Sequence, residues 1–435
     1  MSRRGIRAGS IGLCALLVAL VGSATASANT LWVSTATPSA PFNSCTHPGY
    51  DSLQSAVNGP GTTIRVCAGT YEEQVQIERS VTIIAEGATL KLPATTATST
   101  TPCDKANEAI PPGLPDQDAV SICGGVVTIS GLKLDAIWPG EPVGSGVSCA
   151  YNLTGILVAG GAKLTLTNST IIGAAPQQIN GCQYGLGILV GIPGAGAIGA
   201  ATATITNVAV HGYNKNGITV AGEGASAKIS KATVEGVGPT SVIAQNGIGV
   251  QEGAKATITG VETAFNECND APACGPNPVT QYGGDGVYFY DAGAGSKITG
   301  SISYSNDIGV EAYDAPSTDP MITSDTVEGN RFSAVQIGEG TATVNNDTLT
   351  ESNVGIQLVQ FEGQKAAVGG TASHDTITDM SKWAVLGSSD NAAGDLFGEF
   401  SITGSKISGN PGPTPQKSVE TENPAKLKIY AEKDH

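Results

Sequence analysis

The chain has 435 residues, of which 58 are glycine and only 5% are aromatic, and its formal net charge is −16. So acidic a chain is a poor partner for nucleic acid or an anionic membrane surface, because like charges repel. An anionic polysaccharide is disfavoured for the same reason, unless a bound cation bridges the like charges.

Residues 1–28 have the order of a secretory signal peptide. Arg3, Arg4 and Arg7 precede the apolar run IGLCALLVALVG, and the sequence ASA at residues 26–28 offers a cleavage site. The apolar run is too short to span a bilayer. Cleavage removes three arginines and no acid, which moves the net charge to −19. We therefore expect a secreted or cell-surface protein with no membrane span in its mature chain; a retained anchor is the alternative.

The cysteines predict disulfides. Of nine, Cys14 leaves with the signal peptide, and an even number in an exported chain favours disulfide pairing. A metal site is the weaker interpretation, because no CxxC pair exists and the chain has only four histidines. The count does not fix the connectivity; we predict the local pairs Cys45–Cys67, Cys103–Cys123, Cys149–Cys182 and Cys268–Cys274.

The mature chain begins with elements that differ from those that follow. Residues 50–57 (YDSLQSAV) predict a short helix, with Leu53, Ala56 and Val57 on one face and Asp51 or Ser52 as its N-cap. We expect this helix to cover the first turn of the fold. The segment TTIRVCAGTYEEQVQIERSVTIIAEG then predicts a strand, a glycine turn and two further strands.

A short phrase recurs eight times from residue 155 onward, at intervals of 21 to 39 residues. The copies include GILVAGGA, GITVAGEG, GVYFYDAG and GVEAYDAP, and we number positions from the first residue of each copy. Apolar residues occupy positions two and four: Ile156/Val158, Ile188/Val190, Ile218/Val220, Ile248/Val250, Val287/Phe289, Val310/Ala312, Val335/Ile337 and Ile356/Leu358. Alternation places these pairs on one side of a strand. Units this short bury that side only by stacking, which predicts coils of parallel strands about 4.8 Å apart.

Polar residues recur in the segments between these strands. Asn214, Asn306, Asn330 and Asn353 precede successive copies, where asparagine suits turns and can bond from coil to coil. The pattern Asp-Thr recurs at Asp325, Asp347 and Asp375, where we expect each aspartate to accept hydrogen bonds from backbone N–H groups.

The opening DSLQSAVNGPGTTIRVCAGTYEEQVQI and the N-x-x-G-[IV] turns, as in NDIGV at residues 306–310, resemble right-handed parallel β-helix proteins of the pectin lyase-like superfamily. Pectate lyases, pectin methylesterases and NosD-like repeat proteins are among them. The resemblance covers most of residues 47–410 and implies an all-β, single-stranded right-handed parallel β-helix (a solenoid) with a short N-terminal capping helix. We assign residues 29–410 to this domain and residues 411–435 to a linker and C-terminal tail or cap.

The resemblance does not extend to a catalytic motif. The paired aspartates of the methylesterases are absent, as is the ordered set of motifs of polygalacturonases. Pectate lyases of this fold use an arginine base, and Arg331 is the one arginine of the mature chain beyond its first strands. Arg331 is either such a base or a solvated turn residue.

Positions three and five of the copies should face outward, and position six lies where the strand bends into its turn. From residue 247 to 360 these positions combine tyrosine, acids and glutamine. Flat tyrosine faces beside hydrogen-bonding groups suit sugar rings, so we predict substrate binding by Tyr288, Tyr290, Glu311, Tyr313, Gln336 and Gln357. Position six carries four acids: Glu252, Asp291, Asp314 and Glu339. Carboxylates at coil spacing repel unless one keeps its proton or they share a cation such as Ca²⁺.

Three interpretations of this acidic column remain open. It is a solvated edge that keeps the protein soluble, a Ca²⁺ site, or a saccharide-cleaving face with Asp291 and Asp314 as a catalytic pair. The sequence thus predicts a secreted, monomeric protein that binds or processes a polysaccharide or cell-surface glycan, as a lyase or hydrolase. The alternative is a non-catalytic structural or adhesion protein of the cell surface.

Overall fold

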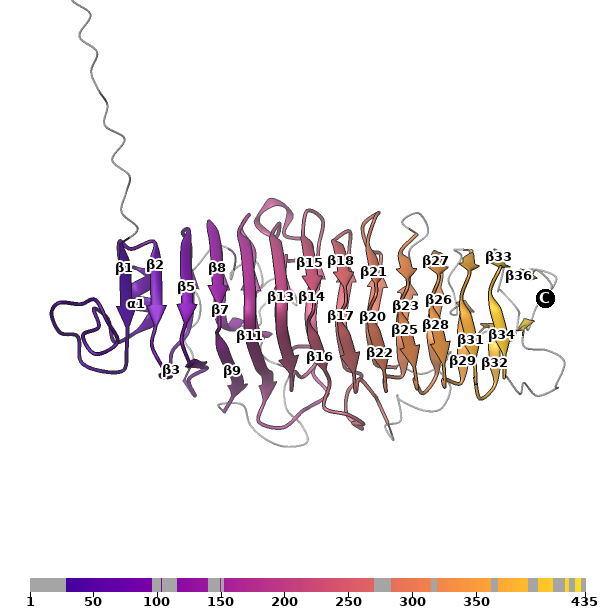
Figure 1. Ribbon diagram of the computed structural model, residues 1–435, viewed down its shortest axis with the longest axis horizontal. Coiled ribbons are helices and arrows are strands. Elements are labelled where there is room, and N and C mark those ends of the chain that lie inside the picture. Colours follow the sequence, from indigo (N-terminus) through magenta and orange to yellow (C-terminus); the bar gives the residue numbers. More distant parts are fainter. Residues whose placement is uncertain are drawn as a thin grey trace, which may run out of the picture.

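The computed structural model describes residues 29–95, 103, 116–139, 149, 152–269, 283–313, 319–360, 367–389, 398–409, 419–421 and 427–431. The predicted signal peptide, Cys274, Asp314 and most of residues 411–435 lie outside the described residues. Three stacks of parallel strands run side by side along an elongated rod (Figure 1). The chain visits one stack after another in each coil, so every strand pairs with its counterpart in the next coil.

Stack 1 is a separate 12-stranded sheet. Its strands are β4 (Val75–Ile77), β7 (Asp116–Ile122), β10 (Asn152–Val158), β12 (Leu186–Val190), β14 (Asn216–Ala221), β17 (Asn246–Gln251), β20 (Asp285–Tyr290), β23 (Ile308–Tyr313), β26 (Ser333–Gly338), β29 (Val354–Gln360), β32 (Trp383–Ser389) and β35 (Val419–Thr421).

Stacks 2 and 3 form one 24-stranded sheet, because the long strands β11 (Lys163–Pro176) and β13 (Thr202–His211) belong to both. Stack 2 also has β1 (Thr30–Val33), β2 (Thr63–Val66), β5 (Val81–Ala85), β8 (Val126–Ser130), β15 (Ser226–Ser230), β18 (Lys255–Thr259), β21 (Lys297–Thr299), β24 (Met321–Thr323), β27 (Thr341–Asn345), β30 (Gly369–Ser373), β33 (Gly398–Thr403) and β36 (Leu427–Ala431). Stack 3 also has β3 (Gly69–Glu72), β6 (Ala88–Lys91), β9 (Lys133–Trp138), β16 (Thr233–Glu235), β19 (Glu262–Ala264), β22 (Ile302–Tyr304), β25 (Thr326–Glu328), β28 (Thr348–Thr350), β31 (Thr376–Thr378) and β34 (Lys406–Ser408).

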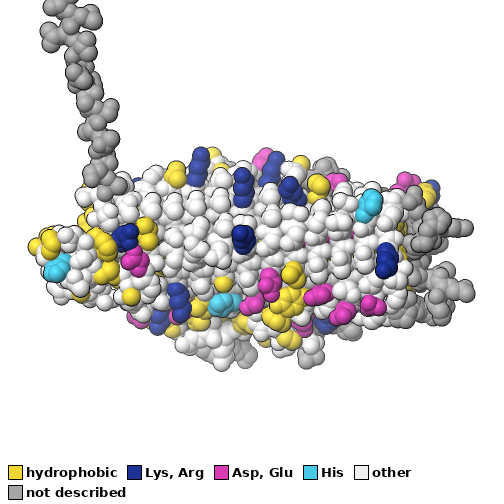
Figure 2. Space-filling model, viewed as in Figure 1, with side chains coloured by type: hydrophobic (Ala, Val, Ile, Leu, Met, Phe, Trp, Pro, Cys, Tyr) yellow, Lys and Arg dark blue, Asp and Glu magenta, His cyan; other side chains and the backbone are white. Residues whose placement is uncertain are grey.

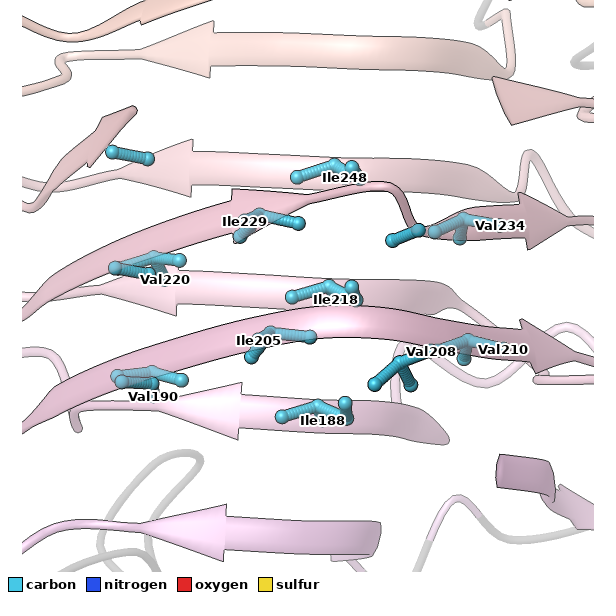
Figure 3. Close-up of a cluster of buried hydrophobic side chains, with 14 of the residues drawn as sticks. Ile188, Val190, Ile205, Val208, Val210, Ile218, Val220, Ile229, Val234 and Ile248 are labelled. Atoms are coloured by element: carbon cyan, nitrogen blue, oxygen red, sulfur yellow. The ribbon is translucent and has the colours of Figure 1, made fainter. Parts of the chain in front are cut away.

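The core is one column of apolar side chains inside the coils, as the repeats predict. All eight pairs at positions two and four are buried in the same cluster. They are in register along stack 1, where Ile188 pairs with Ile218 and Ile218 with Ile248. Stacks 2 and 3 add Ile205, Val210 and others from the opposite walls (Figure 3). The parallel, in-register solenoid predicted from the sequence is therefore confirmed.

Asparagines form a ladder in the turns between stacks 3 and 1. The backbone N–H and the Nδ2 of Asn266 both donate to Asn306 Oδ1, at 3.1 and 2.9 Å. The backbone N–H of Asn306 donates to Asn330 Oδ1 at 3.0 Å, and that of Asn330 to Ser352 Oγ at 3.1 Å. The predicted coil-to-coil bonding is confirmed for Asn306 and Asn330. Separately, Asn214 donates to Cys182 and Tyr184, and Asn353 accepts from Ser381.

Aspartates form a second ladder in the turns between stacks 2 and 3. Asp325 accepts the backbone N–H of Ser301 at 2.7 Å and that of Thr323 at 3.0 Å. Asp347 accepts the backbone N–H of Asp325 at 2.6 Å, and Asp375 accepts the backbone N–H of Asp347 at 2.8 Å. The predicted capping role is confirmed. All three aspartates are buried, and burial raises their pKa values, to about 7, about 8 and about 6 in chain order.

The first coil holds the helix α1 (Leu53–Val57), whose residues Leu53, Ala56 and Val57 enter the core. Ser52 is the N-cap, and its side chain accepts the backbone N–H of Ser55. That this short helix covers the end of the solenoid stays a prediction. A 3-10 helix, η1 (Gly196–Ile198), lies in the connection after β12.

The GTYEE turn holds this helix in place. Glu73 accepts the backbone N–H groups of Leu53 and Gln54 through its two oxygens, at 2.7 and 2.9 Å. Arg79 donates from Nε to the carbonyl of Val57 at the other end of the helix, at 2.6 Å. Opposite charges therefore complement both ends of the helix dipole.

Replacing Glu73 with alanine is expected to lower the free energy of unfolding by about 1–2 kcal/mol, because two helix N–H groups lose a charged acceptor. Its neighbour Glu72 is exposed and meets Lys91 at 3.5 Å with both side chains in solvent. Glu72→Ala should therefore change stability by less than about 0.5 kcal/mol. Chemical denaturation of both variants measures these changes. Equal losses of stability would show that the hydrogen bonds from Glu73 to the helix do not stabilise the protein.

Three of the predicted disulfides are confirmed: Cys45–Cys67, Cys103–Cys123 and Cys149–Cys182. Cys268 is disulfide-bonded as well, and its predicted partner Cys274 lies outside the described residues.

Beyond residue 410, β35 and β36 add further strands to stacks 1 and 2. Among the described residues, no helix has the length and apolar character that crossing a membrane requires. On the face in Figure 2, several acidic side chains lie along the lower edge of the central and C-terminal coils.

Candidate functional site on the outer face of stack 1

The outer face of stack 1 carries three columns of side chains. Positions three and five alternate with the inward pairs, and the residue before each copy, here position zero, lies on the same outer side. Asn216 at position zero shows this, because its Nδ2 donates to Thr219 Oγ1 at position three, at 3.1 Å. The columns therefore bring together side chains from successive coils that are distant in the sequence.

Position five contains a stacked tyrosine pair. Tyr290 of β20 and Tyr313 of β23 are register partners, and their rings lie 5.3 Å apart with an angle of 14° between their planes. Tyr290 is 36% exposed, and Tyr313 is half-buried. Because the rings stack, each covers one face of the other, and the pair spans two coils with part of its surface exposed.

Position three is less open than the sequence predicts. Tyr288 and Glu311 are half-buried, whereas Gln336 and Gln357 are 1% and 2% exposed. Gln336 donates to Glu311 Oε1 at 2.7 Å, and Gln357 donates to Ser388 Oγ at 3.1 Å. The expectation of a solvent-facing column is wrong for these two glutamines, because both side chains are buried.

The acidic column at position six is interrupted. Glu252 and Asp291 are exposed, both with left-handed backbone (φ 55° and 45°), whereas Glu339 is buried at 1% exposure. Asp314 lies outside the described residues. Among those that are described, no three His, Cys, Asp or Glu side chains come together to hold a metal ion. Calcium binding by this column, and catalysis by Asp291 and Asp314, stay predictions.

A cavity of about 270 Å³ lies on the same face, over β10, β12, β14, β17 and β20. Its polar wall includes Asn152, Lys215, Asn216, Thr219, Gln251 and Tyr288. Leu153, Leu186, Leu189 and Pro193 supply apolar surface. Lys215 is the one charged side chain among the described residues of the lining.

Hydrogen bonds fix the polar wall. The Tyr288 hydroxyl donates to Gln251 Oε1 at 2.7 Å and accepts from Asn216 Nδ2 at 3.2 Å. Tyr288 reaches these partners across Gly249, where any Cβ would overlap the tyrosine ring. Asn246 of β17 donates to Asn216 Oδ1 at 3.0 Å, so the network links three successive coils through β14, β17 and β20.

Charged groups surround this wall. Although part of the Lys215 side chain reaches solvent, burial lowers the pKa of its ammonium group to about 8, an effect that Asp285 opposes. Burial, reinforced by Glu311, raises the pKa of Asp285 well above its usual range, and burial also raises that of Glu311. Lys215 donates to the carbonyl of Ala244 at 2.7 Å and forms no salt bridge with a described residue.

Arg331 is neither a free base nor a solvated turn residue. Its Nε donates to Asp307 Oδ1 at 2.6 Å, and its guanidinium also donates to the carbonyl of Cys268. Asp307 is fully buried and accepts the backbone N–H groups of Cys268 and Gly284, each at 2.8 Å. Both alternatives considered for Arg331 from the sequence are therefore wrong: it forms a structural ion pair.

The sequence analysis missed the cavity. Lys215 and Asn216 stand immediately before a copy of the repeat, in a stretch treated only as a turn. One signal was available: position zero is polar at Asn216, Asn246 and Asp285, in three consecutive copies.

Comparisons with known proteins agree with this architecture. The family model described as "Right handed beta helix region" matches residues 193–371. A double mutant of the periplasmic alginate epimerase AlgG has 11% identity and a TM-score of 0.51, covering 88% of this chain and 83% of its own. The lacto-N-biosidase of family GH136 from Eubacterium ramulus has 10% identity and a TM-score of 0.51. The match covers 93% of this chain and 68% of that enzyme's chain. No curated protein sequence matches the chain.

Proposed function

We propose that this chain, whose fold is a right-handed parallel β-helix, is exported and binds a polysaccharide on the outer face of stack 1. The stacked pair Tyr290 and Tyr313 carries this proposal. Sugar rings have apolar C–H faces that pack on aromatic surface, and the exposed part of the stacked pair offers such surface at two successive coils. An alginate epimerase and a lacto-N-biosidase share this fold, which agrees with a carbohydrate as the ligand.

The charge of the protein limits the choice of polymer. At −16, or −19 without the predicted signal peptide, the chain should attract a neutral polysaccharide more readily than an anionic one at low salt. Glu252 and Asp291 add local negative charge beside the tyrosines, because Glu252 donates its backbone N–H to Tyr290 and Asp291 donates its own to Tyr313.

The double substitution Tyr290→Ala/Tyr313→Ala is expected to weaken polysaccharide binding at least about tenfold, which is about 1.4 kcal/mol. The reason is that both rings lose their contact surface together, while the inward core residues are untouched. Affinity electrophoresis over neutral and anionic polysaccharides, with and without Ca²⁺, provides the measurement.

Tyr430→Ala is the matched control, because Tyr430 is 51% exposed on β36, in a different stack. Equal affinities for the double variant and the control would refute the proposed surface. The same panel, read for reducing-sugar release and for ultraviolet absorbance of unsaturated products, separates hydrolase and lyase activity from binding alone. Asp291→Asn then tests the predicted catalytic role of that residue.

A further inference from the structure

The cavity over β10–β20 is contiguous with the tyrosine pair. Gln251 lines the cavity and is the register partner of Tyr290 in the next coil. Tyr288, which also lines the cavity, lies two residues before Tyr290 on the same strand. A sugar chain lying along the rod on Tyr290 and Tyr313 would therefore meet the cavity at its next coil toward the N-terminus.

The lining of the cavity is amphipathic in the way that a sugar ring is. Leucine side chains and Pro193 offer an apolar surface, and amides and hydroxyls offer both donors and acceptors. The volume of about 270 Å³ is just below the range of about 300–1,000 Å³ typical of drug-sized ligand sites. The site therefore suits a ligand of one or two sugar rings rather than a folded polymer.

The surrounding charges favour an uncharged ligand. Asp285, Glu311 and Glu252 lie near enough to Tyr288 to reinforce the increase that burial causes in the pKa of its hydroxyl. Burial raises the pKa values of Asp285 and Glu311, which favours their neutral forms. Lys215, held on the carbonyl of Ala244, and the exposed Glu252 therefore remain as one charge of each sign. An anionic ligand would gain little from local charges that nearly cancel and would meet the net charge of −16 on the chain. Hydroxyl groups, in contrast, can accept from Lys215 and bond the amides without a charge penalty.

We propose that this cavity binds an uncharged sugar unit of the polysaccharide whose neighbouring units lie on Tyr290 and Tyr313. The inference rests on the proposed function and deepens it, because it names a neutral glycan as the ligand class and makes the cavity and the tyrosine pair one continuous site.

Two cavity variants test the inference: Gln251→Ala, which removes an amide from the wall, and Lys215→Met, which removes the ammonium group but keeps the chain length. Each should weaken the binding of neutral oligosaccharides at least about tenfold. Lys228→Met is the matched control, because Lys228 is exposed on β15 in stack 2. Isothermal titration of the full chain with gluco-, manno- and N-acetylglucosamine oligosaccharides measures this, and thermal unfolding confirms that the variants are folded.

A direct readout complements the variants. Bound neutral oligosaccharide should slow the labelling of Lys215 by an amine-reactive reagent, measured by mass spectrometry, and leave the labelling of Lys228 unchanged. Full affinity in both cavity variants, with affinity lost in the tyrosine variant, would overturn the cavity site and leave the proposed function standing. Tighter binding of polygalacturonate or alginate than of neutral glycans would overturn the ligand class. Failure of every glycan to bind would refute the proposed function itself.

Discussion

Substitution of Arg331 by methionine is expected to lower the free energy of unfolding by about 3–5 kcal/mol at neutral pH, because it leaves the buried Asp307 carboxylate without its charged partner. Asp307 has no exposed surface, and Arg331 is 26% exposed. Asp307 also accepts the N–H groups of Cys268 and Gly284, which flank residues 270–282, so the ion pair ties together both sides of the longest interval between copies of the repeat.

The loss should depend on pH. Burial raises the pKa of Asp307, while the Arg331 side chain and the two backbone N–H groups lower it. Without Arg331 the pKa rises further, so the folded variant binds a proton that the unfolded chain releases. The destabilisation is then largest at neutral pH and shrinks in acid. Urea denaturation at two pH values measures both effects.

Arg65→Met is the matched control, because Arg65 pairs with Glu86 where both side chains are more than a third exposed. Exposed ion pairs contribute about 0–1 kcal/mol. The double substitution Arg331→Met/Asp307→Asn should recover part of the loss, since it removes the unpaired charge. Equal losses for the Arg331 and Arg65 variants would contradict a structural role for the buried pair.

The aspartate ladder should make the C-terminal coils less stable as the pH rises. Burial raises the pKa values of Asp325, Asp347 and Asp375 to about 7, about 8 and about 6. The folded state therefore holds protons that the unfolded chain releases near pH 4. This contribution to stability is complete below about pH 4, falls as the pH rises from there, and is fully lost above about pH 8. Thermal unfolding across this interval should show a falling midpoint.

Asp347→Ser identifies the source of that dependence. Serine already occupies the equivalent turns at Ser301 and Ser405, where its hydroxyl accepts the same backbone N–H group, at 3.2 and 3.1 Å. In this variant the slope of the free energy of unfolding against pH should decrease by up to the contribution of one proton, which is about 1.4 kcal/mol per pH unit at its steepest. Glu351→Ser, at an exposed turn, should keep the full slope. An unchanged slope in Asp347→Ser would assign the pH dependence to other groups.

Features that depend on local alternation could be predicted from the sequence. The pairs such as Ile218/Val220 follow a period of two, and their burial requires only that like strands stack. The alignment of Tyr290 with Tyr313 follows from the same register. The bonding of Asp325, Asp347 and Asp375 to backbone also follows from position, because a short acceptor in a repeated turn meets the same N–H group in each coil.

The outer face could not be predicted so well, for two physical reasons. The repeat pattern fixes the side of the strand on which a residue lies but not its exposure, so the sequence alone does not reveal that Gln336 is buried while Tyr290 is exposed. The glycine at position one also interrupts the alternation, which places Asn216 on the same side as Thr219. A prediction from strict alternation places Asn216 and Thr219 on opposite sides of the strand, and therefore does not place both in the wall of the cavity.

Arg331 illustrates a third limit. Its partners Asp307 and Cys268 are 24 and 63 residues away in the sequence, and nothing in the local pattern of GNRFSA indicates them. Only the stacking of three coils brings the guanidinium, the carboxylate and the carbonyl together.

The uniform register of stack 1 has a consequence for how such a surface can change. Copies separated by intervals as different as 21 and 39 residues still pair residue for residue, so the length of a connection is independent of the spacing between strands. Duplication of one coil would displace the two halves of the rod by about 4.8 Å and leave every contact inside each half intact. The length of the proposed binding surface could thus grow or shrink by whole coils, while the chemistry of each coil stays unchanged.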